Sequence, residues 1–298
     1  MSLVLTAHPL LKEHTTLRLG GPALALAVVR GAAGLDQLGK KLPELGGAPF
    51  ALGFGSNLLA GDGQHALVLV HAGNDAKPYF FPLGGTTLVR VGAGFGLPRL
   101  LGLCQRAGLG GLEGLTGVPG RLGGAVAMNA GSYGVELGGL LARVRVWTPE
   151  GGLTWREASD CSFGYRHFNP NMGPTMGVST PFWLIWEVEL LLRAEAPATI
   201  RQRMEATYAK KKATQPVTAK SAGCVFKNPA GHSAGKLLDD AGLRGKRLGG
   251  MAFSTMHANF LVNEGEGTAS QALELMELGR AAVLKKTGLT LQTEVVVL

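Results

Sequence analysis

Three short segments of the chain carry residue types and spacings that could do chemistry. The first is the stretch Gly53-Phe54-Gly55-Ser56-Asn57, which follows a short apolar run. Its glycines permit positive φ angles, and successive backbone N–H groups in such a turn form a concavity that binds an anion. It is not a Walker loop, because no Gly-Lys-Ser/Thr follows, and it does not match G-x-G-x-x-G, because position 58 is Leu. Taken alone, the stretch predicts either an anion-binding turn or an ordinary tight turn.

The second segment, residues 114–134, is nearly bare of large side chains. Seven glycines and three alanines fall within its 21 residues. So many small residues predict that the backbone closely approaches something flat or phosphate-bearing. The alternative is a glycine-rich crossing of a helix and a sheet, although packing alone rarely needs this many glycines.

The third segment, Ser221–Pro229, places Cys224 after a glycine and ends in Lys227, Asn228 and Pro229. Thiol, ammonium and amide groups can all donate hydrogen bonds to a ligand. The alternative is a strand edge with a buried thiol, since free cysteines are often buried. Taken alone, the segment favours the strand edge with a buried thiol.

Composition excludes several classes of protein. The chain has 298 residues, of which 46% are hydrophobic and only 17% are charged, so it is not a disordered chain. Glycine contributes 46 residues, about twice its usual share. The three cysteines are odd in number and widely spaced, which is typical of reduced thiols in a cytoplasmic protein. No signal segment and no apolar run long enough for a membrane span is present, so we expect neither secretion nor a membrane partner.

The net charge of +8 favours anionic ligands. The cationic residues are scattered, apart from Lys210-Lys211-Lys212. No helix-turn-helix, zinc finger or basic strand with stacking aromatics can be discerned, so we expect no nucleic-acid partner. Small phosphorylated ligands suit the charge better.

Helical and strand patterns mix along the chain without a regular repeat, which predicts the α+β class. Apolar runs and alternations predict strands at 22–30, 50–52, 66–71, 87–91, 140–147, 183–192, 259–263 and 291–298. Apolar stripes and stop signals predict helices at 34–45, 97–107, 196–212, 233–241 and 268–287. Thr268 and Gln271 have the spacing of a capping box at the start of the last helix. Composition shifts near residue 195, where we expect a domain boundary.

Six motifs together resemble those of the UDP-N-acetylenolpyruvoylglucosamine reductase family, in the family's order and over nearly the whole chain. Each motif is weak alone, and their order is what carries the resemblance. They are Thr15 to Ala23, Gly55-Ser56-Asn57, Val118 to Gly134, Phe163-Gly164-Tyr165-Arg166, Ser221 to Pro229, and His257 to Asn263.

The resemblance implies a two-part FAD-binding region of the vanillyl-alcohol-oxidase type followed by an α+β substrate domain. The corresponding division is 1–73 and 74–195 for FAD and 196–298 for the substrate. It also implies noncovalent FAD, with NADPH as the hydride donor. The implied reaction is reduction of the enolpyruvyl group of UDP-N-acetylglucosamine enolpyruvate to UDP-N-acetylmuramate, in peptidoglycan precursor synthesis.

The resemblance also implies roles for individual residues. Arg166 matches an arginine that suits a carboxylate, Glu294 matches a late site glutamate, and Cys224 stands where many members carry a proton-donating serine. The residues expected to bind FAD are Gly53, Gly55, Ser56, Asn57, Gly117, Gly120, Gly123, Gly124 and Ala125. Those expected to bind substrate are Tyr133, Lys227, Asn228 and Asn259, while Lys211, Lys212 and Gln215 stay open as alternatives near the diphosphate or enolpyruvate. No metal site is expected.

Two departures from the family pattern stand out. Members often carry Leu-Glu-Pro-Glu-Val, whereas this chain has Leu291-Gln292-Thr293-Glu294-Val295, which leaves the anchoring of Glu294 open. Some members insert a long segment with a tyrosine that closes over the substrate. Only fifteen residues separate Arg166 from Phe182, and none is Tyr, so the chain resembles the shorter type.

Two other functions remain as alternatives. One is a different FAD-dependent oxidase of the same fold that acts on a sugar or lactone, against which the motifs at 221–229 and 257–263 argue. The other is a non-enzymatic nucleotide-binding module, which would give a colourless protein. The expected partner is a UDP-sugar, and no obligate protein partner is implied.

Overall fold

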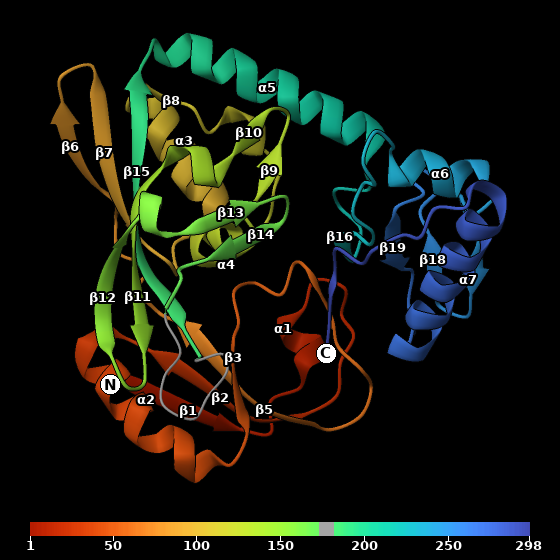
Figure 1. Ribbon diagram of the computed structural model, residues 1–298, viewed down its shortest axis with the longest axis horizontal. Coiled ribbons are helices and arrows are strands. Elements are labelled where there is room, and N and C mark those ends of the chain that lie inside the picture. The colour runs from red at the N-terminus through yellow and green to blue at the C-terminus, as the bar shows by residue number, and fades with distance from the viewer. Residues whose placement is uncertain (173–181) are drawn as a thin grey trace. The chain divides into compact units, whose positions relative to one another are not determined.

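The computed structural model describes residues 1–172 and 182–298 (Figure 1). By its internal contacts, the chain separates into two compact units. Each unit is assembled from three stretches of sequence. Unit 1 contains residues 1–8, 24–53 and 66–209, and unit 2 contains residues 9–23, 54–65 and 210–298. The two hydrophobic cores follow the same division, because one is built from unit 1 residues and the other from unit 2 residues.

The first sheet of unit 1 contains the strand that leads to Gly53. Its order is β1-β2-β5-β3, with the strands β1 (Leu3–Ala7), β2 (Ala23–Val29), β5 (His65–Ala72) and β3 (Ala48–Ala51). Helix α2 (Gly31–Leu45) follows β2 and buries Leu35, Leu38 and Leu42. This spacing of three and four residues places one apolar face against the core. Because β3 runs parallel to β5, Gly53 emerges just beyond the carboxyl end of the pair.

A larger antiparallel sheet forms the rest of the unit 1 framework. Its order is β12-β11-β15-β7-β6, with β12 (Gly152–Glu157), β11 (Leu141–Thr148), β15 (Leu184–Ala194), β7 (Thr86–Gly92) and β6 (Tyr79–Leu83), and β8 (Leu109–Gly110) pairs with β15. Alternate residues such as Val144, Val146 and Val188 are fully buried, as the twofold side-chain period of strands requires. Helices α3 (Leu97–Arg106) and α4 (Leu122–Ala127) follow β7 in the chain and pack into this core.

Two small hairpins and the larger part of a long helix complete unit 1. The hairpins are β9 (Gly131–Ser132) with β10 (Val135–Glu136), and β13 (Ser162–Gly164) with β14 (His167–Asn169). Short 3-10 turns lie at Glu113–Leu115, Leu137–Leu140 and Ala158–Asp160. Helix α5 (Pro197–Thr214) is fixed at its start by Arg203, which pairs with Glu113 and Glu195.

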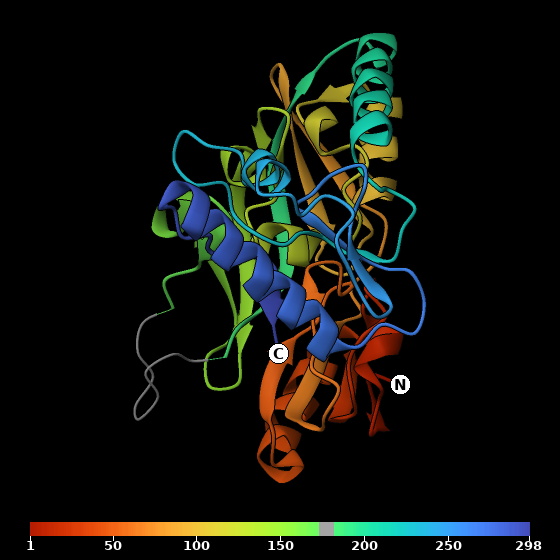
Figure 2. The same cartoon turned by 90° about the vertical axis from the view of Figure 1, so that its right-hand side faces the viewer.

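Unit 2 is a small sheet covered by two helices. The sheet order is β16-β19-β18-β17, with β16 (Ser221–Cys224), β19 (Phe260–Asn263), β18 (Met251–Phe253) and β17 (Arg247–Leu248), and the helices are α6 (Ala234–Asp240) and α7 (Ala269–Thr287). Figure 2 shows α7 along its length in dark blue. Leu275, Met276 and Val283 on α7 are buried with Phe253 of the sheet. The predicted capping box between Thr268 and Gln271 is confirmed.

The two N-terminal stretches of unit 2 join this core through backbone pairing. They contribute α1 (Leu11–His14) and β4 (Leu58–Leu59), and β4 pairs in parallel with β20 (Val296–Val297) near the end of the chain. The side chains of Leu17, Leu19 and Leu59 are buried in the unit 2 core.

Most of the predicted elements are confirmed, and the mixture of helices and strands confirms the α+β class. The expected strand over 291–298 is wrong in extent, because only Val296–Val297 forms a ladder. Before it, the chain is held by single contacts, such as the bridge from Phe226 to Thr293. Residues 9–23 and 54–65 pack with the C-terminal residues in unit 2. The expected domain boundaries at 73 and 195 therefore stay a prediction about functional domains.

A membrane-spanning helix was not expected. Across the described ranges, no helix has the length and apolarity that crossing a membrane requires.

Candidate functional site

A pocket in unit 1 lies beside the glycines of the second segment. The empty space in and above it, which includes open solvent, is about 410 Å³. Its lining is apolar apart from Arg121, whose guanidinium donates to the carbonyl of Gly94 at 2.9 Å. The lining residues are Ala51, Leu52, Gly53, Ala72, Ala93, Gly94, Arg121, Gly123, Gly124, Ala127, Trp183, Leu184 and Ile185.

Gly53 and Gly124 keep this pocket free of side chains. A Cβ on Gly53 would lie 3.7 Å from the Cα of Gly124, and one on Gly124 would lie 3.9 Å from the Cα of Gly53. These are ordinary contacts, so packing does not exclude a side chain at either position. Gly123 differs, because its Cβ would lie 2.9 Å from the Cβ of Ala93. Gly53 and Gly124 therefore leave room for a ligand, whereas Gly123 lets α4 pack closely.

The other expected FAD residues of unit 1 lie around α4 without lining the pocket. Ala125 is buried in the hydrophobic core. Gly117 and Gly120 lie in the turn before α4, and the carbonyl of Gly120 accepts from the N–H of Leu97 at 2.9 Å. Their place is consistent with shaping the start of α4.

The turn Gly55-Ser56-Asn57 belongs to unit 2 and is held on two sides by neighbouring segments. A Cβ on Gly55 would lie 2.0 Å from the carbonyl oxygen of His14, so only glycine fits. The N–H of Thr16 donates to the carbonyl of Gly55 at 3.2 Å. On the other side, the Nδ2 of Asn57 donates to the carbonyl of Glu294 at 3.0 Å. Sequence reasoning placed this turn near FAD but missed its bond to Glu294.

Cys224 and Glu294 lie on neighbouring hydrogen-bonded segments of unit 2. Cys224 ends β16, is half-buried and forms no disulfide. The next carbonyl, that of Val225, accepts from the N–H of Glu294 at 2.7 Å. The thiol and carboxylate thus belong to one continuous stretch of paired backbone, and the side chain of Glu294 is also half-buried.

The residues after Cys224 are held by amide side chains. Asn259 is only 1% exposed. Its Oδ1 accepts from the N–H of Phe226 at 2.9 Å, and its Nδ2 donates to the carbonyl of the same residue at 2.8 Å. Both amide atoms are thereby engaged with backbone, which disagrees with the expectation that Asn259 faces the substrate.

Lys227 and Asn228 are more accessible. Lys227 is half-buried and its N–H donates to the carbonyl of Gln292 at 2.8 Å. Asn228 is exposed, and its Oδ1 accepts from the N–H of Ala234 at 2.9 Å, where α6 begins. One face of Asn228 is therefore committed to the helix, while its Nδ2 is the group that could reach a ligand.

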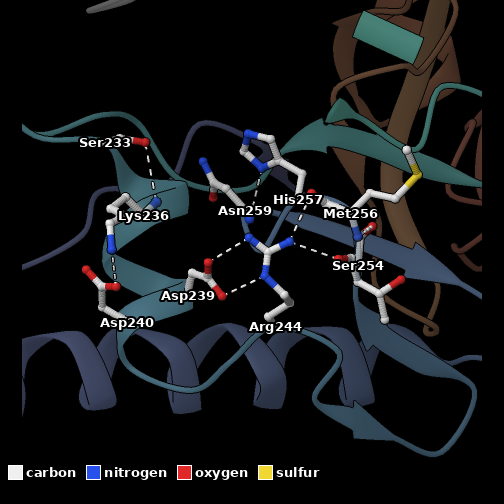
Figure 3. A network of polar contacts seen from close by, with 10 residues as sticks. Ser233, Lys236, Asp239, Asp240, Arg244, Ser254, Met256, His257 and Asn259 are labelled. Carbon is white, nitrogen blue, oxygen red and sulfur yellow. Dashed lines mark hydrogen bonds and ion pairs between the residues drawn. The ribbon is translucent and has the colours of Figure 1, made fainter. Parts of the chain in front are cut away.

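A polar network fixes the turn that precedes Asn259 (Figure 3). Arg244 forms a two-pronged pair with Asp239, with both N···O distances at 2.6 Å. Its third nitrogen donates to the carbonyls of Thr255 and Met256 at 2.8 Å and 3.1 Å. The Nδ1 of His257 accepts from the N–H of Asn259 at 3.2 Å. Burial, together with the charge of Arg244, lowers the pKa of His257, so the ring is held neutral as an acceptor.

Tyr133 and Arg166 stand at the tips of the two unit 1 hairpins, and both adopt left-handed backbone. Tyr133 has φ +47° between β9 and β10, and Arg166 has φ +56° between β13 and β14. The guanidinium of Arg166 lies 4.9 Å from the ring centroid of Tyr165. Tyr133 is exposed and Arg166 is half-buried, so the first tip is open to solvent and the second is partly covered.

Burial distinguishes the three candidates near the end of α5. Lys211 is only 3% exposed, while Lys212 is exposed and Gln215 is half-buried. Burial lowers the pKa of Lys211 to about 8. Burial therefore distinguishes Lys211 from the other two candidates.

The C-terminal domain of UDP-N-acetylenolpyruvoylglucosamine reductase matches residues 215–298. The reductase of Nitratidesulfovibrio vulgaris is 49% identical over 97% of this chain and 97% of its own, and that of Oleidesulfovibrio alaskensis is 46% identical over 99% and 98%. The chain belongs to the UDP-N-acetylenolpyruvoylglucosamine reductase family.

The fold agrees with this membership. The crystal structure of the reductase from Thermus caldophilus superposes with a TM-score of 0.81, at 35% identity and 99% coverage of both chains. The expected enzyme class, an oxidoreductase, and the expected activity are confirmed. The protein is an oxidoreductase that reduces a UDP-sugar enolpyruvate in peptidoglycan precursor synthesis. The expected lack of a tyrosine-bearing insertion concerns residues 167–181, of which 173–181 lie outside the described residues.

Members of this reductase family use FAD and take hydride from NADPH, so the cofactor expectation is confirmed at the level of the family. The unit 1 pocket fits a flat ring system, because its lining is apolar and two facing glycines leave its wall bare. The roles of individual residues are a separate question.

We expect stability to depend on pH through His257. Its pKa is lowered from 6.5 in the folded protein, so the unfolded chain binds a proton more readily. The stabilisation is complete above the unfolded pKa and is lost as pH falls through 6.5 toward the folded value. Denaturant unfolding of the FAD-loaded protein between about pH 5 and 8 measures this slope.

His257→Gln should flatten that slope, whereas His232→Gln, at an exposed histidine of the same unit, should leave it unchanged. Equal slopes in wild type and His257→Gln would show that the ring does not control stability.

Proposed function

We propose that the reductase carries out proton transfer with Cys224 and stabilises the reacting substrate with Arg166 and Glu294. The observation that carries this proposal is the backbone pairing that joins Glu294 to the residue after Cys224, at 2.7 Å between the N–H of Glu294 and the carbonyl of Val225. Such pairing holds the two side chains on neighbouring segments. A positioned acid and a positioned carboxylate are what a two-part addition of hydride and proton requires.

FAD, when bound, accepts hydride from NADPH and supplies it to the enolpyruvyl double bond. In unit 1, Gly53, Gly123 and Gly124 would lie against it, supported by their places in the pocket wall. Gly117, Gly120 and Ala125 would act by shaping the turn and helix around that wall. In unit 2, the pinned turn Gly55-Ser56-Asn57 would hold FAD through backbone N–H groups and the Ser56 hydroxyl.

Arg166 would bind the substrate carboxylate. Adding hydride to an enol ether next to a carboxylate spreads negative charge toward that carboxylate. A guanidinium is matched to a carboxylate by its two parallel N–H donors. The position of the half-buried Arg166 at a hairpin tip supports this role, because a hairpin end can present the guanidinium to a ligand.

Cys224 would donate the proton that completes the reduction. The proton leaves the thiol for the carbanionic carbon, and the thiolate regains a proton from water. An unperturbed thiol has a pKa of about 8.5, so it is protonated at neutral pH and is a far stronger acid than a serine hydroxyl. Glu294, half-buried on the paired segment, would stabilise the enolate arrangement or assist proton delivery.

The remaining substrate contacts are proposed from accessibility. Tyr133 and Asn228 are exposed and Lys227 is half-buried, so each can reach a UDP-sugar. Asn259 would act indirectly by fixing the backbone of Phe226. Among the basic candidates, we assign Lys211 to the diphosphate, because an ion pair formed at a buried side chain is screened less by salt.

We also propose that the enzyme works in the cytoplasm on its UDP-sugar, without nucleic acid or an obligate protein partner. Cys104, Cys161 and Cys224 all lack disulfides, which supports a reducing compartment. The NADPH requirement of the family points to the same place. Retention on duplex or single-stranded nucleic acid that weakens with salt would contradict the proposal.

Gly124→Val should yield a folded protein that has lost FAD. The side chain would enter the space that Gly53 and Gly124 leave bare, with no backbone atom closer than 3.9 Å at its Cβ. Overpacking of this kind weakens binding by at least about tenfold. Titration of the apoprotein with FAD, followed by flavin fluorescence, measures the loss. Gly139→Val, at an exposed glycine with nothing within 4 Å, is the control and should bind FAD normally.

Cys224→Ala should slow product formation by about 100-fold or more, because general acids contribute that much. The measurement is anaerobic: NADPH reduces the flavin, UDP-N-acetylglucosamine enolpyruvate is added, and flavin reoxidation is followed in a single turnover. Cys224→Ser should retain turnover, and reduction by NADPH should be unchanged in both variants.

Cys161→Ala, at a half-buried cysteine of unit 1, is the control and should reoxidise at the wild-type rate. Unchanged reoxidation in Cys224→Ala would remove the thiol from the mechanism. No reoxidation in the wild type would defeat the proposed function altogether.

Lys211→Met should weaken UDP-sugar binding by about tenfold or more, since a charge-assisted contact to the diphosphate is lost. Wild-type binding should also weaken as pH rises through about 8, where Lys211 of the enzyme without substrate loses its proton. Isothermal titration of the oxidised enzyme at several pH values tests both points. Lys212→Met, its exposed neighbour, should change neither, and an unchanged pH profile in Lys211→Met would exclude the assignment.

A further inference from the structure

The two hairpin tips of unit 1 are joined by one buried side chain, that of Asn129. It is 2% exposed and lies two residues after the last residue of α4. Its Nδ2 donates to the carbonyl of Gly164 at 3.0 Å, in the hairpin that carries Arg166. The same nitrogen lies 3.4 Å from a carboxylate oxygen of Glu136, in the hairpin that carries Tyr133. One amide thus reaches both hairpins.

The oxygen of the Asn129 amide holds the chain just after the hairpin of β9 and β10. The Oδ1 of Asn129 accepts from the N–H of Gly138 at 2.8 Å, just after β10. Gly138 itself lies against the ring of Phe163, since a Cβ there would be 2.6 Å from its Cδ1. The two hairpins are therefore in contact around Asn129, and their mutual position depends on its hydrogen bonds.

The guanidinium of Arg166 lies over the first hairpin. A Cβ on Gly131 would be 3.3 Å from its Nη1 and 2.8 Å from the Cγ of Glu136. The absence of a side chain at this position lets the Arg166 guanidinium lie close above β9. Its direction consequently depends on how the two hairpins are set against each other, which is what Asn129 controls.

The position of Asn129 at the end of a helix explains only part of why this residue is an asparagine. Asn129 has φ +38°, and asparagine is well tolerated in left-handed backbone at a helix end. That preference concerns the backbone alone and would be met equally by glycine. The three contacts of the side chain, made in a nearly fully buried place, call for a separate role.

We infer that Asn129 is a positioning residue that aims Arg166, and with it Tyr133, at the carboxylate-bearing end of the substrate. The inference rests on the proposed role of Arg166. It predicts that loss of the Asn129 amide removes the enzyme's preference for a carboxylate-bearing ligand while leaving other contacts to the UDP-sugar intact. A merely structural residue would weaken all ligands alike.

The test compares two ligands on the oxidised enzyme without NADPH, so that no turnover occurs. UDP-N-acetylglucosamine enolpyruvate carries the carboxylate, and UDP-N-acetylglucosamine lacks it. Isothermal titration gives a dissociation constant for each, and their ratio is the carboxylate preference. A bidentate charge-assisted pair should give the wild type a preference of about 10- to 100-fold.

Two variants remove the amide in different ways. Asn129→Gly keeps left-handed backbone and deletes the side chain, and Asn129→Asp keeps the acceptor for Gly138 but removes the donor to Gly164. Both should retain FAD, judged by absorbance, and should lower the preference to about threefold or less, as expected for a misplaced guanidinium. In an Arg166→Lys background, Asn129→Gly should change the preference no further.

Asn171→Gly is the matched control. Asn171 also has left-handed backbone, at φ +49°, and its Nδ2 donates to a backbone carbonyl, that of Asp160, at 2.7 Å. It lies beyond β14, at the open end of the hairpin away from Arg166. Its substitution should leave the ligand preference at the wild-type value.

The outcomes separate the inference from the function on which it rests. If Arg166→Lys lowers the preference but neither Asn129 variant does, the positioning role is overturned and the role of Arg166 stands. Equal weakening of both ligands, or loss of FAD from both Asn129 variants, would make Asn129 structural and would also overturn the inference. If Arg166→Lys keeps the full preference, both assignments fail.

Discussion

The parallel pairing of the chain end with residues 57–59 is the constraint on which the rest of unit 2 depends. The N–H of Val296 donates to the carbonyl of Asn57 at 3.0 Å, and the N–H of Leu298 donates to the carbonyl of Leu59 at 3.0 Å. The N–H of Gly61 donates to the carbonyl of Leu298 at 2.9 Å. Two-residue strands stabilise little by themselves. Burial of Leu59 and of neighbouring core side chains supplies the hydrophobic stabilisation that keeps these bonds closed.

Once that pairing exists, three functional segments become one hydrogen-bonded system. The Asn57 amide donates to Glu294, whose N–H donates in turn to Val225, next to Cys224. The Thr16 hydroxyl donates to the carbonyl of Ser221 at 2.6 Å, at the other end of β16. The anion-binding turn, the carboxylate and the thiol therefore share backbone anchors, and a change at one anchor alters the geometry of the others.

The sequence patterns predict most helices and strands, but they predict this system poorly. The amphipathic period predicts α2 and α7, because a helix that buries one face has apolar residues three and four positions apart. The strand at 291–298 was expected to be long because its side chains alternate, and Leu291 and Val295 are indeed buried. Its ladder is nevertheless short, since pairing partners come from residues more than 200 positions away, which no local pattern encodes.

Residue type identifies chemistry more readily than it identifies geometry. Asn259 and Asn129 both carry amides that suit a ligand, yet both amides bind backbone in buried positions. A buried amide left without partners is costly, so such residues occur where irregular backbone needs satisfying. Irregular backbone is also what presents Tyr133 and Arg166, both left-handed at hairpin tips. Strained tips can be retained only if surrounding contacts fix them, which makes the buried asparagines as necessary to the site as the residues that would touch the substrate.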